Sequence, residues 1–340
     1  MKELKFLCVQ PDDTYYTWQC HLWIESLRKL GLSNNAIILI FIPNYREKNP
    51  KWQQLIDLYP EAEFVFYKDV DNVSKYLGIY IPVLRPYCLM RYFKEHPDMK
   101  EKAVFYCDCD VIFTEKFDIS KYIDDDVCYL SDANSYINAS YFDSKTKDVL
   151  PEKLEEYKTK DVLGETCSLV GITREIAEKH NLHSGGAQYL LKNIDGAFWE
   201  KVMMDCISIR VHLMNVNKAF FANESKGFQS WCADMWAVLW NLWEREQETK
   251  NIEEMQFSWA SDLIEKLEKC SILHNAGITG DDMGGGEYQA FYKGKYHLGK
   301  NPFDDPYLQI IYNSPKSKKR CTHYYVSQLI ELNNKYKLKY

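Results

Sequence analysis

The sequence of 340 residues contains no long hydrophobic run, no CxxC pair and no internal repeat. Its longest strongly apolar stretch, residues 36–43, is far shorter than the roughly 18 to 20 residues that cross a bilayer. The first residues also lack the long apolar core and the small-residue cleavage site of a secretory signal peptide. These absences argue against a membrane-spanning helix, and we expect a cytoplasmic protein.

Glycine and proline are also few, at 15 and 11 residues, while 46% of the residues are apolar. This composition excludes disordered and collagen-like chains and supplies ample material for a buried core. The 11 cysteines are odd in number, scattered, and mostly set in apolar segments. We therefore expect reduced thiols in the core, and the lack of a CxxC pair argues against a structural zinc site.

Charge is distributed unevenly along the chain. The net charge is −7, yet residues 313–340 carry seven Lys or Arg side chains against one Glu, which gives this segment +6 and leaves −13 for the rest. Such asymmetry is typical of proteins that contact a polyanion such as nucleic acid. We treat this segment as a basic C-terminal extension that either contacts nucleic acid or forms a solvated tail.

The first part of the chain alternates between strand and helix patterns. Short apolar runs predict buried strands, and apolar residues spaced three and four apart predict helices. Strands are expected at residues 4–9, 36–42, 63–67 and 103–113, and helices at 18–30, 52–59 and 85–95. Because strands and helices alternate, we expect an α/β fold in which helices flank a mixed, mostly parallel Rossmann-like sheet.

A charged stretch at residues 143–160 divides the chain. It holds five acidic and five basic residues and few apolar ones, so we expect an exposed insertion. We expect it to separate a nucleotide-sugar half, about residues 1–140, from an acceptor half, about residues 161–312. Within the latter, helices are expected at 187–214 and 231–245, and a short strand at 271–274.

The most informative motif is Asp108-Cys-Asp110, which follows the apolar run 103–107. Open α/β sheets bind their ligands at the carboxyl ends of the strands. Two carboxylates at positions i and i+2 can hold one divalent cation, which can then bridge a diphosphate that the acids alone would repel. The motif therefore predicts a DxD site for Mn²⁺ or Mg²⁺ and a nucleotide sugar.

Other interpretations of the same motif stay open. Haloacid-dehalogenase-like phosphatases also place Asp-x-Asp after an apolar strand; Asp108 would then be the nucleophile, with Lys266 or Lys269 and the segment 280–282 as later motifs. The two acids are also compatible with a strand-capping turn. A third possibility is a sugar- or DNA-binding module without catalysis.

Further residues are candidates for the same site. His274 follows a short apolar strand and suits a third metal ligand. Gly185 and Gly186 lie at the expected start of a helix, where glycine lets the backbone approach a ligand closely and the helix amides favour an anion. This arrangement would place Gln188 near the sugar. We expect nucleotide-sugar contacts from Gln10, Arg85, Asp108, Gly185, Gly186 and Lys300.

Asp234 is the single charge in an otherwise apolar helix. A buried helix rarely carries an unpaired carboxylate, because burial of a charge is costly. Asp234 should therefore pair with a buried Arg or Lys or face a polar site. We expect it, with Gln188, to be catalytic.

Taken in order, these motifs resemble the plant hydroxyproline O-arabinosyltransferase and peptidyl serine O-galactosyltransferase family, which has a GT-A fold. The matching segments span most of residues 6–280 and are Tyr16-Thr-Trp-Gln, Tyr80-Ile-Pro, Arg85-Pro86, Phe105 to Ile112, Trp231 to Met235, and Leu273-His-Asn-Ala-Gly277. The resemblance implies metal-dependent transfer of a pentose such as arabinose, or a hexose such as galactose, from a UDP-sugar with retention of configuration.

By the same resemblance, Asp108 and Asp110 would hold the metal and diphosphate, and His274 would be the third metal ligand. Asp234 would match the acidic residue of the family's W-x-x-E-M segment. At that position this chain has Asp instead of Glu. The plant enzymes are membrane-anchored, and this sequence shows no anchor. An acceptor in the cytosol is therefore expected: a hydroxylated or hydroxymethylated cytosine in phage DNA, a protein hydroxyl or a glycan.

Overall fold

The computed structural model describes residues 2–78, 80–277, 291–297 and 299–338. The chain forms two compact units, each assembled from stretches that are far apart in the sequence. Unit 1 comprises residues 1–4, 69–105 and 122–252, and unit 2 comprises residues 5–68, 106–121 and 253–340. The predicted division into halves of about 1–140 and 161–312, followed by the extension 313–340, stays a prediction.

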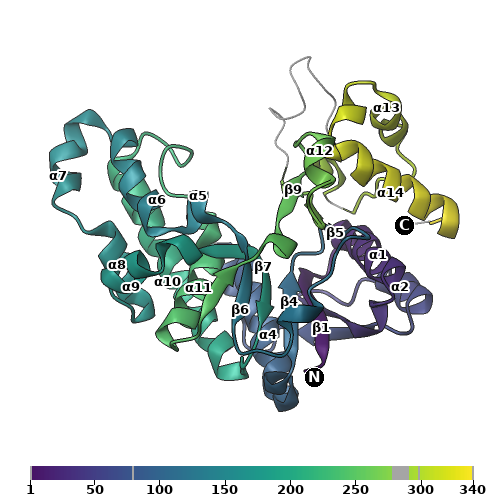
Figure 1. Ribbon diagram of the computed structural model, residues 1–340, viewed down its shortest axis with the longest axis horizontal. Coiled ribbons are helices and arrows are strands. Elements are labelled where there is room, and N and C mark those ends of the chain that lie inside the picture. Colours follow the sequence, from purple (N-terminus) through teal and green to yellow (C-terminus); the bar gives the residue numbers. More distant parts are fainter. Residues whose placement is uncertain (1, 79, 278–290, 298, 339–340) are drawn as a thin grey trace. The chain divides into compact units, whose positions relative to one another are not determined.

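Unit 2 begins with a parallel β-α-β-α-β arrangement (Figure 1). Its strands β1 (Leu4–Pro11), β2 (Ala36–Ile42) and β3 (Glu63–Lys68) lie in the order β3-β2-β1, and both pairs are parallel. Helices α1 (Thr14–Lys29) and α2 (Trp52–Leu58) connect them. All seven residues of β2 are buried, which explains its uninterrupted apolar run. These predicted elements are confirmed, although α1 starts four residues before the predicted Trp18.

A second, three-stranded sheet in unit 2 has the order β5-β10-β9. Strand β10 (Ile272–His274) is antiparallel to β5 (Val111–Phe113) and parallel to β9 (Phe257–Trp259). The prediction of one continuous strand over 103–113 is wrong. Strand β4 (Ala103–Cys107) ends before the acidic pair, and β5 belongs to the three-stranded sheet, which does not contain β4. Two carboxylates in a buried ladder would be costly, and the chain turns at them instead.

The basic extension is folded onto unit 2. Helix α13 (Tyr307–Asn313) is followed by α14 (Cys321–Tyr336), whose apolar side chains share a buried cluster with Trp18 and Leu22 of α1. At the end of α14, Lys335 and the Tyr336 hydroxyl donate to the Glu25 carboxylate over 2.6 and 2.9 Å. The alternative of a solvated tail is therefore wrong for α14. The short α12 (Ile264–Leu267) precedes β10.

Unit 1 contains a sheet in the order β4-β7-β6-β8. Strand β6 (Cys128–Asp132) is antiparallel to β7 (Gly185–Leu191) and parallel to β8 (Thr249–Asn251). The described helices of the same unit are α3 (Ser74–Leu77), α4 (Leu84–Glu95), α5 (Asn134–Ile137), α6 (Ala139–Ser144), α7 (Leu154–Lys158), α8 (Val162–Val170), α9 (Arg174–Lys179), α10 (Gly196–Phe220) and α11 (Ala233–Glu244). The charged stretch 143–160 forms short, mostly exposed helical segments, as predicted.

The predicted helix over 187–214 is only partly correct. Residues 185–191 are the strand β7, and the helix α10 starts at Gly196, where the Asp195 side chain accepts a hydrogen bond from the Phe198 amide over 2.9 Å. Pairing of β7 with β6 places Leu190 opposite Tyr129. This non-local pairing overrides the local pattern. The predicted helices at 85–95 and 231–245 correspond to α4 and α11.

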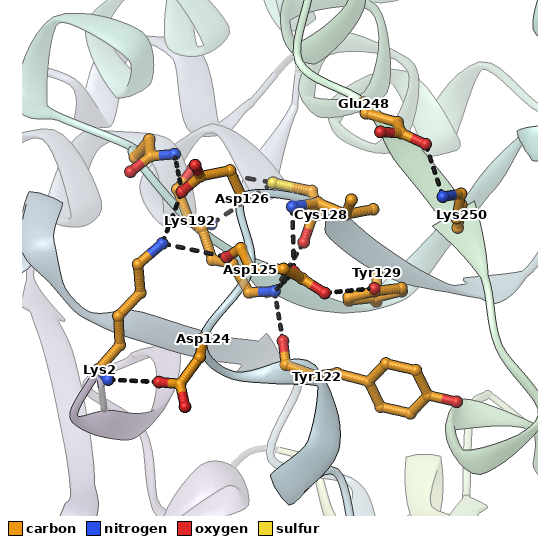
Figure 2. A network of polar contacts seen from close by, with 12 residues as sticks. Lys2, Tyr122, Asp124, Asp125, Asp126, Cys128, Tyr129, Lys192, Glu248 and Lys250 are labelled. Atoms are coloured by element: carbon orange, nitrogen blue, oxygen red, sulfur yellow. Dashed lines mark hydrogen bonds and ion pairs between the residues drawn. The ribbon is translucent and has the colours of Figure 1, made fainter.

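A buried lysine stabilises unit 1 just after β7 (Figure 2). The Lys192 side chain has no exposed surface, and its ammonium contacts the Asp125 carboxylate and the carbonyls of Tyr122 and Val127. The Tyr129 hydroxyl donates to the same carboxylate over 2.7 Å. Because a buried ammonium is costly unless it is paired, these contacts hold the segment 122–127 in place.

Two further expectations concern the whole chain. All 11 cysteines are buried and free, as predicted. Across the described residues, none of the helices combines the length and the apolar character that a membrane span needs. The mixed α/β fold with mostly parallel strand pairs and flanking helices is confirmed.

Candidate metal centre

The strand register in unit 2 brings the acidic pair to His274. Residues 108–110 form the turn between β4 and β5, and β10 runs antiparallel to β5 with His274 opposite Val111. The Asn275 amide continues this ladder by donating to the Asp110 carbonyl over 2.9 Å. His274 therefore lies beside Asp110, although the two residues are 164 positions apart in the chain.

The three predicted metal ligands form one cluster. Asp108, Asp110 and His274 each offer a ligand atom, and these atoms lie within 4.8 Å of one another. Asp110 Oδ1 is 3.2 Å from His274 Nε2 but is buried without a hydrogen bond among the described residues. A buried carboxylate oxygen that lacks a donor fits a metal ligand. Two carboxylates and one imidazole could hold a divalent metal ion.

Lys293 completes this cluster, and its ammonium contacts Asp110 Oδ2. It lies on a short 3₁₀ turn, Lys293–Tyr296, next to Phe291. The rings of Phe291 and Tyr296 both pack edge-on against Trp18, with centroids 6.1 Å away. Lys293 itself is buried.

The sequence predicted a nucleotide-sugar contact from Lys300, which is exposed, and not from Lys293. The signal that it missed is the pair of aromatic residues at Phe291 and Tyr296. Lys293 lies between them in sequence and is itself only 8% exposed, and a buried lysine requires a partner acid.

The charges around Asp110 keep its carboxyl group ionised. Burial alone would raise the pKa of Asp110, but the neighbouring Lys293 and His274 outweigh burial and hold this pKa far below its ordinary value. Burial and the Asp110 charge together raise the pKa of the Tyr15 hydroxyl. Asp110 is therefore a carboxylate, the form that binds a metal, and Tyr15 is a neutral phenol.

The His274 ring is fixed by two aromatic neighbours from β9. Its centroid lies 5.1 Å from Trp259 and 5.7 Å from Phe257. His274 is 5% exposed and Trp259 is its partner in the β9–β10 register. The ring orientation is thus set by packing, which presents Nε2 to Asp110.

Gln10 lies near the carboxyl end of β1 in the same unit and is 3% exposed. Its Nε2 has no hydrogen-bond partner among the residues that the structure describes. The nearby Asp12 accepts from Trp52 Nε1 over 2.7 Å and from the Asn49 amide over 2.9 Å, so its carboxylate serves the fold. Gln10 keeps an amide donor for a ligand.

Asp234 and Arg85 lie together in unit 1. Asp234 is in the first turn of α11; its Oδ2 accepts from Arg85 Nη1 over 2.8 Å and its Oδ1 from the Tyr80 hydroxyl over 2.7 Å. The sequence left two partners for this acid open, a buried cation or a polar site, and the structure shows the cation. Arg85, predicted to bind diphosphate, forms this ion pair.

Gly185, Gly186 and Gln188 lie within the strand β7, also in unit 1. The predicted helix start at these glycines is therefore wrong. A Cβ atom on Gly185 would lie 2.5 Å from the Ser131 carbonyl, and one on Gly186 would lie 2.6 Å from Met235 Cε. Packing within the unit already explains both glycines. Gln188 is fully buried.

The residues expected for a phosphatase are less well supported. Lys266 forms an ion pair with Asp262 over 2.7 Å on the surface of unit 2. The segment 280–282, which would supply the later acidic motif, lies outside the described residues. The phosphatase interpretation stays a prediction without a further structural observation in its favour.

No family model and no curated protein matches the chain, so its resemblance to the plant enzymes stays a prediction. Among solved structures, it is similar to the bifunctional glycosyltransferase WbbM in its apo form, with 11% identity and a TM-score of 0.45 over 96% of this chain. The galactosyltransferase LgtC, in complex with donor and acceptor sugar analogues, has 9% identity and a TM-score of 0.44, with 83% of this chain and 92% of LgtC covered.

Mouse xyloside xylosyltransferase 1, also in its apo form, has 9% identity and a TM-score of 0.35. That match covers 81% of this chain and 98% of the mouse protein. This chain spans only about half of WbbM, at 52% of its length.

Proposed function

We propose that this chain is a metal-dependent glycosyltransferase that moves a sugar from a UDP-sugar to a hydroxyl acceptor. The observation that carries the proposal is the cluster of Asp108, Asp110 and His274, whose ligand atoms lie within 4.8 Å of one another beside Lys293. Two carboxylates alone would repel a diphosphate. A divalent cation together with the lysine makes the sum of these charges positive, which favours a diphosphate.

Each residue of unit 2 has a distinct role in this proposal. Asp108, Asp110 and His274 Nε2 would hold Mn²⁺ or Mg²⁺, which when bound supplies positive charge against the departing diphosphate. Lys293 and the exposed Lys300 would add charge near the phosphates. The free amide donor of Gln10 would hydrogen-bond the nucleotide.

The other proposed site residues lie in unit 1. We propose transfer with retention of configuration, in which Asp234 and Gln188 stabilise the oxocarbenium-like sugar. The ion pair with Arg85 and the hydrogen bond from Tyr80 would hold the Asp234 carboxylate in one orientation. Gly185, Gly186 and Arg85 remain proposed contacts of the nucleotide sugar.

The transferred sugar would be a pentose such as arabinose or a hexose such as galactose. We propose three acceptor classes: a hydroxylated or hydroxymethylated cytosine in DNA, a protein hydroxyl and a glycan. The cations Lys316, Lys318 and Lys319 are exposed, which suits contact with DNA. A DNA acceptor would make binding weaken steeply with salt.

The test is release of UDP from a panel of UDP-sugars, with and without Mn²⁺. We expect release with one sugar, dependent on the metal and lost in Asp110→Asn. Asp305→Asn is a matched control, because its carboxylate pairs with Lys295 in the same unit, over 2.6 Å. Release of phosphate from simple phosphoesters without any UDP release would instead support the phosphatase. Donor binding that is insensitive to metal and without turnover would support a binding module.

A further inference from the structure

In this structure, Lys293 occupies one side of the carboxylate on which the candidate metal site depends. Its ammonium contacts Asp110 Oδ2, while Oδ1 of the same group lies 3.2 Å from His274 Nε2. The side chains of Lys293 and Asp110 are only 10% and 11% exposed. Little water is therefore available to screen charges at this position.

An ammonium and a divalent cation on one carboxylate repel each other. A metal bound to Asp110 would lie about 2.0–2.2 Å from a carboxylate oxygen, which is within a few ångströms of the ammonium. Since both are positive and poorly screened, their repulsion is strong. Binding of the metal and the present position of Lys293 therefore oppose each other.

We propose that Lys293 is a resident counter-ion that competes with the divalent cation for Asp110, so that binding of the metal releases the lysine ammonium. This inference rests on the proposed function in one respect, namely that Asp108, Asp110 and His274 hold the metal. In the metal-free protein the lysine neutralises a buried acid. On metal binding, a mobile positive charge becomes free for an anionic ligand.

The local structure allows this movement without unfolding. Phe291 and Tyr296 anchor the turn by packing on Trp18, and the Phe291 amide donates to Thr322 Oγ1 of α14 over 2.9 Å. Only the flexible four-carbon side chain of Lys293 has to change its rotamer. The backbone that carries it can stay in place.

The chain offers a matched control two residues further along. Lys295 is on the same 3₁₀ turn but is exposed, and its ammonium pairs with Asp305. It shares the charge, the side-chain length and the local backbone of Lys293. It lacks the contact with Asp110.

The first experiment measures Mn²⁺ affinity in the absence of nucleotide, at one fixed pH, from the electron paramagnetic resonance signal of free Mn²⁺. We expect Lys293→Met to bind Mn²⁺ about tenfold more tightly than wild type or better, because one nearby positive charge is removed. Lys293→Arg and Lys295→Met should stay close to wild type. Equal or weaker binding by folded Lys293→Met would overturn the competition.

The second experiment needs no substitution and decides the matter if Lys293→Met does not fold. Brief acetylation of the wild-type protein, followed by mass spectrometry of its peptides, reports how accessible each lysine is. Mn²⁺ should raise the modification of Lys293 severalfold and leave Lys295 unchanged. Bound Mn²⁺ with no change at Lys293 would contradict the release of the ammonium.

The outcomes separate this inference from the proposed function. Mn²⁺ binding by wild type that is lost in Asp110→Asn, without tightening in Lys293→Met, rejects the competition and leaves the metal centre intact. No Mn²⁺ binding by either folded wild type or folded Lys293→Met rejects both.

Discussion

Asp110 and Lys293 should each destabilise the metal-free protein when replaced alone, and much less when replaced together. Their charged groups are in contact, and their side chains are only about one-tenth exposed. Two unit charges about 4 Å apart attract by about 4 kcal/mol at an effective dielectric constant of about 20. Removing one partner of a buried ion pair leaves the other uncompensated and costs about 3–5 kcal/mol. We expect this loss for Asp110→Asn and for Lys293→Met.

The double variant Asp110→Asn/Lys293→Met leaves neither charge buried. Replacing both members of a buried pair is often close to neutral, so we expect it to lie within about 1–2 kcal/mol of wild type. The assay is urea unfolding in the presence of a chelator, analysed as a double-mutant cycle; the two single losses together should exceed the loss in the double variant by at least about 4 kcal/mol. Additive effects, or single losses below about 1 kcal/mol, would refute the account of this pair.

Two further predictions concern the fold. Burial lowers the pKa of His21 from 6.5 to about 3, so between these pH values only the unfolded chain takes up this proton. The free energy of unfolding should therefore fall by about 1.4 kcal/mol for each pH unit from pH 6.5 towards 3. In urea unfolding measured over this pH range, His21→Gln should flatten the slope. Gly185→Ala should cost about 1–3 kcal/mol in thermal unfolding, because its Cβ would lie 2.5 Å from the Ser131 carbonyl, whereas Gly78→Ala, with open space, should be nearly neutral.

The elements with strong local patterns could be predicted from the sequence. Residues 36–42 form β2 with the predicted bounds, because an uninterrupted apolar run between polar segments suits a strand that is buried on both faces. Helix α11 follows from its dense apolar pattern in the same way.

Elements that depend on distant partners could not be predicted. The segment 185–191 is a strand because it pairs with β6, more than 50 residues earlier, and nothing local distinguishes it from the first turn of a helix. The apolar residues on either side of the acidic pair also look like one strand, since the pattern does not show that β5 joins a different sheet.

The candidate site also combines residues that a local pattern predicts with contacts that depend on distant segments. Asp108 and Asp110 are two positions apart in sequence, and their position after an apolar run already indicates a cation site. His274 was predicted from chemistry alone, and its place beside Asp110 follows from the β5–β10 register. Lys293 was not predicted, because its contact with Asp110 joins positions that are 183 apart in the chain.

The central claim is that one cation links the carboxylates of unit 2 to a nucleotide sugar. Its most direct test is the binding of the UDP-sugar that supports UDP release, measured calorimetrically with and without Mn²⁺, in wild type and in Asp110→Asn. The account predicts that Mn²⁺ strengthens donor binding at least about tenfold in wild type and has no effect in Asp110→Asn. Equal donor affinity with and without the metal in wild type would contradict it.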